Sequence, residues 1–245
     1  SCPFSEKGQL WGNPIYNWAA MEDDEYSWWI KRFQHSFKLF DILRVDHFRG
    51  FESYWEVKYG AKDAVDGQWT KGPGMKLFKK LKTELGDLNI IAEDLGFLTE
   101  DVKKLLKDSG FPGMKVLQFA FDSREESDYL PHNYDENSVV YTGTHDNSTV
   151  IGWLSSANKD DVNYATEYLK LDQNEGENWG FIRGAWGSTS YLAITTMQDL
   201  LGLDDRARMN IPSTVGDNWA WRMEKTDITE EVIKKIGHMT RIYRR

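Results

Sequence analysis

The sequence repeats one unit several times, in which a short apolar run ends in charged or polar residues and leads into a helical segment. Such runs are typical of buried parallel strands, and right-handed crossovers place all their carboxyl ends at one edge of the sheet. We expect five strands, at about 40–46, 89–94, 115–121, 138–143 and 207–211. Reactive side chains collect at that edge in α/β barrels, so the pattern favours a TIM-type barrel over a doubly wound sheet. No glycine-rich dinucleotide fingerprint and no Walker loop follows any strand.

The segments between the strands follow helical periodicity or lack a pattern. Helices are expected at about 23–40, 76–85, 99–109, 148–154, 158–179, 180–201 and 229–244. The glycine-rich stretch 52–74 is expected to be irregular, and residues 1–18, with two glycines and two prolines, form a loop.

Composition excludes several classes of protein. The chain has 245 residues, of which 40% are hydrophobic and 28% are charged, enough for one large domain with a substantial core. A formal charge of −9 argues against nucleic acid or an anionic membrane surface as a partner. A single cysteine permits no intrachain disulfide, and we see neither a signal peptide nor a membrane-spanning run. We therefore expect a cytoplasmic protein.

The stretch Arg44–Gly50, which directly follows an apolar run, holds a carboxylate, an imidazole and two guanidiniums. Strand alternation sends Arg44 and Asp46 to the same side of the sheet. A guanidinium beside a carboxylate lowers the pKa of that carboxylate, and a nucleophilic Asp must be ionised. Taken alone, the stretch is explained equally well by a structural Arg–Asp pair at a strand end.

Acids stand at the ends of three expected strands, at Asp46, Glu93 and Asp146. Cleavage of a glycosidic bond needs two carboxyl groups, one to attack the anomeric carbon and one to protonate the departing oxygen. The proton donor must hold its proton near neutral pH, which burial or a neighbouring negative charge favours. Asp94 adjoins Glu93, but alternation turns it the other way, and we expect it to be structural.

A divalent metal site is the competing use for such a cluster, with Asp46, His47, His145 and Asp146 as its ligands. Arg44 and Arg49 would repel a cation there, and the chain has no His-x-x-x-His or Cys-x-x-Cys spacing. A nucleophilic serine is disfavoured because no Gly-x-Ser-x-Gly elbow is present. We expect no metal and no cofactor.

Trp11 lies in the polar loop between Gln9 and Asn13. A large apolar ring in a Gly/Pro loop suits a lid or a stacking platform for a ligand. It suits a plug over the core equally well, and its spacing leaves both interpretations open.

Several motifs together resemble one family. They are Gly8–Pro14, Arg44–Gly50, Ala92–Gly96, Met114–Asp122, Pro131–Asn133, Gly143–Asn147 and Asn210–Thr214. In this order they are similar to the 4-α-glucanotransferases (amylomaltase, disproportionating enzyme; glycoside hydrolase family 77). The resemblance covers essentially the whole chain. The acid motifs are shared with α-amylases, so the first loop and the Gln-Phe-Ala-Phe and Pro-His-Asn stretches carry the narrower assignment.

The resemblance implies a (β/α)8 barrel of which this chain holds the C-terminal portion, strands 4 to 8. Asp46 would be the nucleophile on the fourth strand, Glu93 the general acid/base on the fifth, and Asp146, on the seventh, the group that holds sugar hydroxyls. Further implied substrate contacts are Arg44, His145, Trp11, Gln9, Phe119, Asp122 and Asn210. The implied organisation is one partial barrel domain over 1–245, with an acceptor-side loop at 1–18 and a helical insertion at 155–180.

The implied reaction is the transfer of α-1,4-glucan segments between maltooligosaccharides, with retention through a glycosyl–Asp46 intermediate. The family's first three strands have no counterpart here, and a half-barrel exposes two sheet edges. We therefore expect a fragment, or a chain whose N-terminal half of the barrel is supplied as a separate piece. Two alternatives stay open: an α-amylase-type hydrolase, and an inactive glucan-binding remnant.

Overall fold

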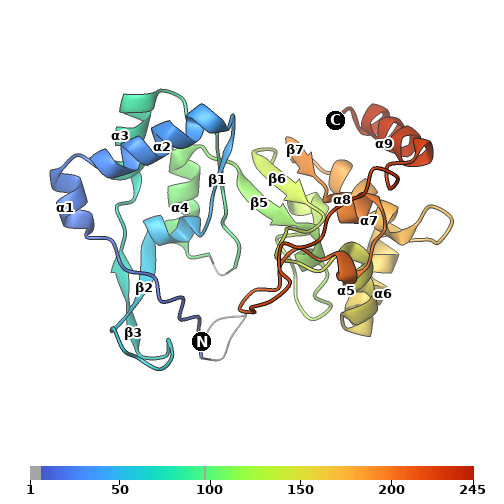
Figure 1. The fold of residues 1–245 in the computed structure, drawn as a ribbon, viewed down its shortest axis with the longest axis horizontal. Helices are drawn as coiled ribbons and strands as arrows, with labels where there is room; N and C mark the ends of the chain where they lie inside the picture. Colours follow the sequence, from blue (N-terminus) through green and yellow to red (C-terminus); the bar gives the residue numbers. More distant parts are fainter. Residues whose placement is uncertain (1–6, 97) are drawn as a thin grey trace. The chain divides into compact units, whose positions relative to one another are not determined.

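The computed structural model describes residues 7–96 and 98–245, and the chain forms two compact units that divide between Met114 and Lys115. Figure 1 shows the elements of each unit, coloured along the chain. Each unit has its own hydrophobic core and is taken in turn.

The first unit combines parallel strands, helices and a hairpin. Its elements are α1 (Trp18–Asp23), α2 (Ser27–Leu39), β1 (Leu43–Val45), β2 (Ser53–Val57), β3 (Gly67–Lys71), α3 (Met75–Leu85), β4 (Ile90–Ala92) and α4 (Glu100–Ser109). Strand β5 (Gly113–Val116) begins here and crosses the boundary. β1 pairs in parallel with β4, and β4 pairs in parallel with β5 through Ala92 and Gly113. β2 and β3 form an antiparallel hairpin.

The core of the first unit is largely aromatic. Phe48, directly after β1, is fully buried, and its ring stacks on Phe78 of α3 with the ring centres 5.3 Å apart. Trp29 and Phe33 line the buried face of α2. The buried ring of Phe48 holds the backbone in place just after β1, and this fixes where the polar residues on either side of Phe48 begin.

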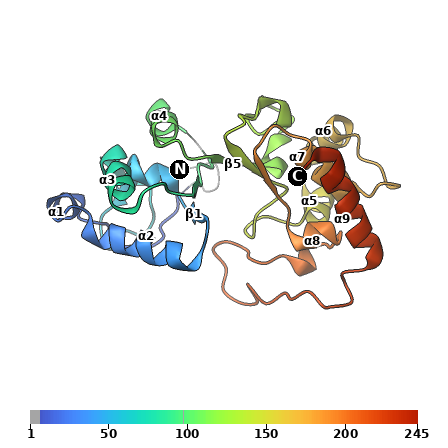
Figure 2. The same cartoon turned by 90° about the horizontal axis from the view of Figure 1, so that it is seen from above.

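The second unit contains β6 (Ser138–Tyr141), α5 (Val150–Ser156), α6 (Lys159–Leu169), α7 (Glu177–Trp186), β7 (Leu192–Ile194), α8 (Met197–Leu200) and α9 (Glu230–Tyr243). β6 pairs in parallel with β7. The side chains of α7 fill the core together with β6, and Met239 of α9 packs on Trp179 and Ile182 of α7. Figure 2 shows α9 beside α7 and the long irregular segment that leads to it from α8.

The fold is α/β with parallel strands and outer helices, as predicted, but several local predictions are wrong. Residues 207–211 form no strand, and the last parallel strand is β7 at Leu192–Ile194, inside the stretch expected to be one helix over 180–201. Gly187–Ser190 ends α7, and pairing with β6 makes the next apolar residues a strand. The stretch 52–74 holds the β2–β3 hairpin rather than irregular chain.

A further error concerns β5, which covers Gly113–Val116, whereas residues 117–120 form a 3-10 helix instead of continuing the strand to 121. The helices α3, α4 and α9 match their predictions to within a residue. In the described ranges no helix combines the length and apolarity needed to cross a bilayer. The single domain over 1–245 and the insertion at 155–180 stay predictions, and residues 1–6 of the expected first loop lie outside the described chain.

Candidate active site

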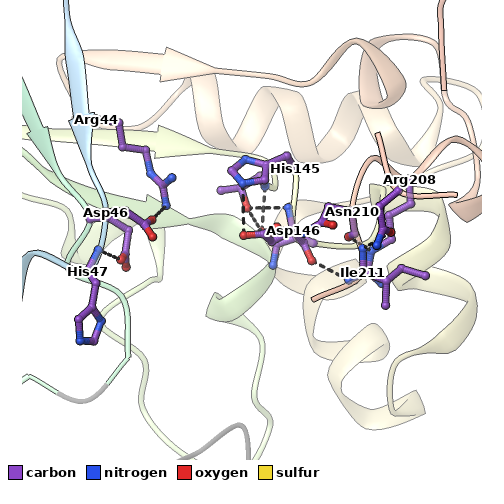
Figure 3. A network of polar contacts seen from close by, with 12 residues as sticks. Arg44, Asp46, His47, His145, Asp146, Arg208, Asn210 and Ile211 are labelled. Carbon is purple, nitrogen blue, oxygen red and sulfur yellow. Dashed lines mark hydrogen bonds and ion pairs between the residues drawn. The ribbon is translucent and has the colours of Figure 1, made fainter. Parts of the chain in front are cut away.

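The ion pair predicted at the end of β1 is present. A terminal guanidinium nitrogen of Arg44, Nη2, lies 2.8 Å from Oδ1 of Asp46, and Figure 3 shows the two side chains facing each other. The side chain of Asp46 is 75% exposed, whereas that of Arg44 is 29% exposed. The carboxylate is therefore open to a ligand, while the side chain of the arginine that pairs with it is less exposed.

A second contact fixes the direction of the Arg44 guanidinium. Its Nε donates to the sulfur of Met114 at 3.2 Å. The backbone N–H of Met114 in turn donates to Oδ1 of Asp94 at 2.7 Å, and Asp94 is buried. This confirms that Asp94 is structural: it holds the first residues of β5 against β4.

Glu93 is tied to the end of β1 by its backbone and its side chain. Its N–H donates to the carbonyl of Val45, and its own carbonyl accepts from Phe48, both at 2.9 Å. Its carboxylate accepts the backbone N–H of His47 at Oε2 (2.6 Å) and that of Leu95 at Oε1 (2.7 Å). Glu93 is thus fixed on the strand next to Asp46.

Electrostatics give Glu93 the character of a proton donor. Burial raises the pKa of its carboxyl group above the usual range, and the Asp46 carboxylate adds to the rise. The N–H groups of Leu95 and His47 oppose this rise, as does the charge of Arg44. A raised pKa is what a general acid near neutral pH requires.

His47 has a left-handed backbone, with φ of 48°, which is uncommon for a residue with a side chain. This turn directs its N–H to Glu93, while Figure 3 shows its ring pointing away from Asp46. The ring meets Trp11 edge-on, with centres 5.0 Å apart, and burial lowers the pKa of His47. Among the described residues no group of three or more His, Cys, Asp or Glu side chains could hold a metal ion.

Trp11 is 59% exposed, and its indole N–H donates to Oε1 of Gln9 at 2.9 Å. With one edge against His47 and much of its surface open, it is no plug over the core. The described loop thereby presents an aromatic surface held next to the Asp46 segment.

In the second unit, Asp146 lies in a loop clamped by two residues of the 207–211 stretch. Nδ2 of Asn210 donates to Oδ1 of Asp146 at 2.6 Å, and the Asn210 backbone N–H donates to the carbonyl of His145 at 3.0 Å. Nη2 of Arg208 donates to the carbonyl of Asp146 at 2.6 Å, and Nη1 donates to Oγ of Ser148 at 3.2 Å. Figure 3 shows this network.

His145 has an aromatic neighbour. Its Nε2 lies 3.3 Å from Oδ2 of Asp146, and its ring centre is 5.1 Å from that of Trp219. Trp219 has φ of 64°, and its N–H donates to the carbonyl of Met209 at 2.6 Å. Left-handed backbone at a bulky residue costs free energy and is found where surrounding structure imposes it, often at functional sites.

Phe119 and Asp122 have other partners. Phe119 meets Tyr129 edge-on, with ring centres 5.7 Å apart. Asp122 binds Arg124 through both carboxylate oxygens, at 2.7 and 2.6 Å, and this lowers the pKa of Asp122 to about 2. The substrate contacts of Phe119 and Asp122 stay predictions.

The structure thus groups the expected residues within each unit. Arg44, Asp46 and Glu93 come together in the first, and His145, Asp146 and Asn210 in the second. Sequence reasoning missed Arg208 and Trp219. Arg208 stands two residues before Asn210, yet its fork reaches a loop some sixty positions earlier, and no local pattern signals such a contact.

Parallel strands that end in carboxylates, one paired with arginine and one with a raised pKa, are typical of the α/β-barrel class of enzymes. A family model described as 4-alpha-glucanotransferase matches residues 3–228. The chain belongs to the 4-alpha-glucanotransferase family.

Relatives named 4-alpha-glucanotransferase support this at high identity. That of Clostridium butyricum is 54% identical over 248 residues, which cover 100% of this chain and 51% of the relative. The chloroplastic/amyloplastic protein of Solanum tuberosum is 47% identical over 245 residues, which cover 99% of this chain and 42% of the relative.

A solved structure also matches, the amylomaltase from Streptococcus agalactiae in complex with acarbose. It shares 45% identity with a TM-score of 0.95, over 99% of this chain and 49% of that one. The chain therefore spans about half the length of these relatives. Together with the parallel strands, this match confirms the prediction of a partial TIM-type barrel.

Proposed function

We propose that this chain carries the catalytic groups of a 4-α-glucanotransferase that works by a retaining double displacement. The observation that carries the proposal is the pairing on adjacent strands of an exposed, arginine-bound Asp46 with a Glu93 whose pKa burial raises. One carboxylate is suited to attack and one carboxyl group to protonation, the two roles that retention requires.

In the first step an Asp46 oxygen bonds to the anomeric carbon of the donor glucan as the glycosidic bond breaks. Glu93 gives its proton to the departing 4-oxygen, so the shortened chain leaves as an alcohol. In the second step the Glu93 carboxylate takes the proton of an acceptor 4-hydroxyl, whose oxygen bonds to the anomeric carbon and frees Asp46.

The remaining roles follow from family membership. Asp146 and His145 bind donor sugar hydroxyls and stabilise the transition state, with Asn210 on the Asp146 carboxylate. Trp11 and Gln9 line the path of the acceptor sugar. The substrates are α-1,4-glucans and maltooligosaccharides, and the acarbose bound to the Streptococcus agalactiae relative is consistent with such a site.

We also propose that an N-terminal barrel half completes the site, either as part of the same polypeptide or as a separate piece. Leu39, Phe40 and Ile42, just before β1, are 63%, 60% and 46% exposed. In the described chain β1 pairs only with β4. A strand placed against β1 would cover this apolar edge.

The test is incubation with maltotriose and separation of the products by size, for the chain alone and with the N-terminal half of a relative. Longer maltooligosaccharides plus glucose, absent with Asp46→Asn, are expected. Maltose and glucose without longer products would identify a hydrolase instead. A glucan-binding remnant would give no product, either alone or with the N-terminal half of a relative, and its Asp46→Asn variant would bind glucan as well as the wild type does.

A further inference from the structure

The loop Gly143–Thr149 begins and ends at the same side chain. At its start, Thr142 follows β6 and donates Oγ1–H to Oδ2 of Asp199 at 2.6 Å. At its end, Val150 opens α5 and donates its backbone N–H to Oδ1 of Asp199 at 2.7 Å. One carboxylate thus closes a loop whose two attachment points are eight residues apart in sequence.

Asp199 is itself held firmly. It is 1% exposed, on the short helix α8. Its N–H donates to Oγ1 of Thr196 at 3.2 Å, and its carbonyl accepts from Nδ2 of Asn178 on α7 at 2.7 Å. A buried carboxylate is tolerated when its oxygens are hydrogen-bonded, and both oxygens of Asp199 are used on the two loop ends.

We propose that Asp199 is a positioning residue that fixes the loop carrying His145 and Asp146 by tying its two ends together. Arg208 and Asn210 hold the middle of the loop, but they can place Asp146 only if the loop enters and leaves at set points. Because Thr142 and Val150 both bind the buried Asp199 carboxylate, the loop between them can adopt far fewer conformations than a loop with free ends. The consequence for catalysis rests on the proposed function of Asp146.

The hydrogen bond between Thr142 and Asp199 could instead serve only to stabilise strand β6. The same strand offers a control for that alternative. At its opposite end, Oγ of Ser138 lies 2.7 Å from Oγ of Ser190 in a buried hydrogen bond. Thr142 is 0% exposed and Ser138 is 3% exposed. Loss of the Thr142 hydroxyl removes its hydrogen bond to Asp199, and loss of the Ser138 hydroxyl removes its hydrogen bonds to Ser190 and to the carbonyl of Asp135. Only the loss at Thr142 releases the loop.

The experiment compares Thr142→Val, which keeps the shape and removes the hydroxyl, with Thr142→Ser, which restores it, and with Ser138→Ala. Amide hydrogen exchange of the 143–150 segment is measured for each, with kcat and KM for maltotriose in the form of the protein that transfers glucan. Thr142→Val is expected to speed exchange in the loop and to lower kcat about tenfold with little change in KM. Thr142→Ser should recover both values, and Ser138→Ala should change the melting temperature alone.

Unchanged loop exchange in Thr142→Val would overturn the inference. So would equal losses of kcat in Thr142→Val and Ser138→Ala, because the effect would then be general destabilisation. If the wild type transfers no glucan in any form, the proposed function fails, and loop exchange in Thr142→Val still decides whether the tie to Asp199 holds the loop.

Discussion

Removal of the Asn210 amide should weaken transfer without dismantling the Asp146 loop. Asn210→Ala deletes the 2.6 Å hydrogen bond from Nδ2 to Asp146 and keeps the backbone N–H that binds the His145 carbonyl. The Arg208 contacts to the loop also stay. The substitution therefore isolates one charged hydrogen bond.

The size of the effect follows from the exposure of the site. Hydrogen bonds to charged groups contribute about 1.5–3 kcal/mol, and we take about 1.5 because the Asp146 side chain is 42% exposed. Since about 1.4 kcal/mol corresponds to a factor of ten, kcat/KM for maltotriose should fall about tenfold.

The matched control is Asn158→Ala. The Asn158 side chain caps α6 by accepting the N–H of Asp160 at 2.9 Å, so this substitution should cost about 1 kcal/mol of stability and leave kcat/KM unchanged. A kcat/KM for Asn210→Ala within about twofold of wild type would refute the role given to the amide. An equal loss in Asn158→Ala would assign the effect to stability.

Three further predictions concern charge and packing. Burial raises the pKa of Glu93 in the folded protein above its ordinary value of 4.5. As the pH rises from 4.5 through the folded pKa, the wild type therefore loses free energy of unfolding, because the folded state holds this proton more tightly than the unfolded state does. Glu93→Gln has no such proton, so its free energy of unfolding in urea should rise relative to that of the wild type over this pH range. Arg124→Ala should return the pKa of Asp122 from about 2 toward 3.8 in an NMR titration, because the partner cation is gone; a pKa still near 2 would contradict this. Gly152→Ala should lower the melting temperature, because the added Cβ would lie 2.0 Å from Oδ1 of Asp205; an unchanged value would show that Asp205 can move away.

Much of the first unit's site could be predicted from sequence because its interactions are local or follow strand alternation. Arg44 and Asp46 are two residues apart on one strand, and alternation alone predicts their pairing. The same rule turned Asp94 away from Glu93, toward the backbone of Met114. The raised pKa of Glu93 rests on burial, which the apolar run before it already suggests.

The errors lie where distant parts of the chain decide the local structure. Leu192–Ile194 is three residues long, and only its pairing with β6 makes it a strand. The β2–β3 hairpin is held by a cross-strand pair, Trp55 and Trp69, with ring centres 5.3 Å apart, and its glycines obscured the pattern. The Arg208 fork and the Asp199 tie each join residues about fifty to sixty positions apart, which no periodicity reveals.

The central claim, that Asp46 is the nucleophile, is tested most directly by trapping the intermediate. In Glu93→Gln, a glucosyl fluoride donor needs no acid to release fluoride, whereas the second step lacks its base, so the glycosyl–enzyme should accumulate. Mass spectrometry of the digested protein should then find one glucosyl group on the peptide that contains Asp46. A label on Asp146, or turnover without any label on Asp46, would contradict the mechanism.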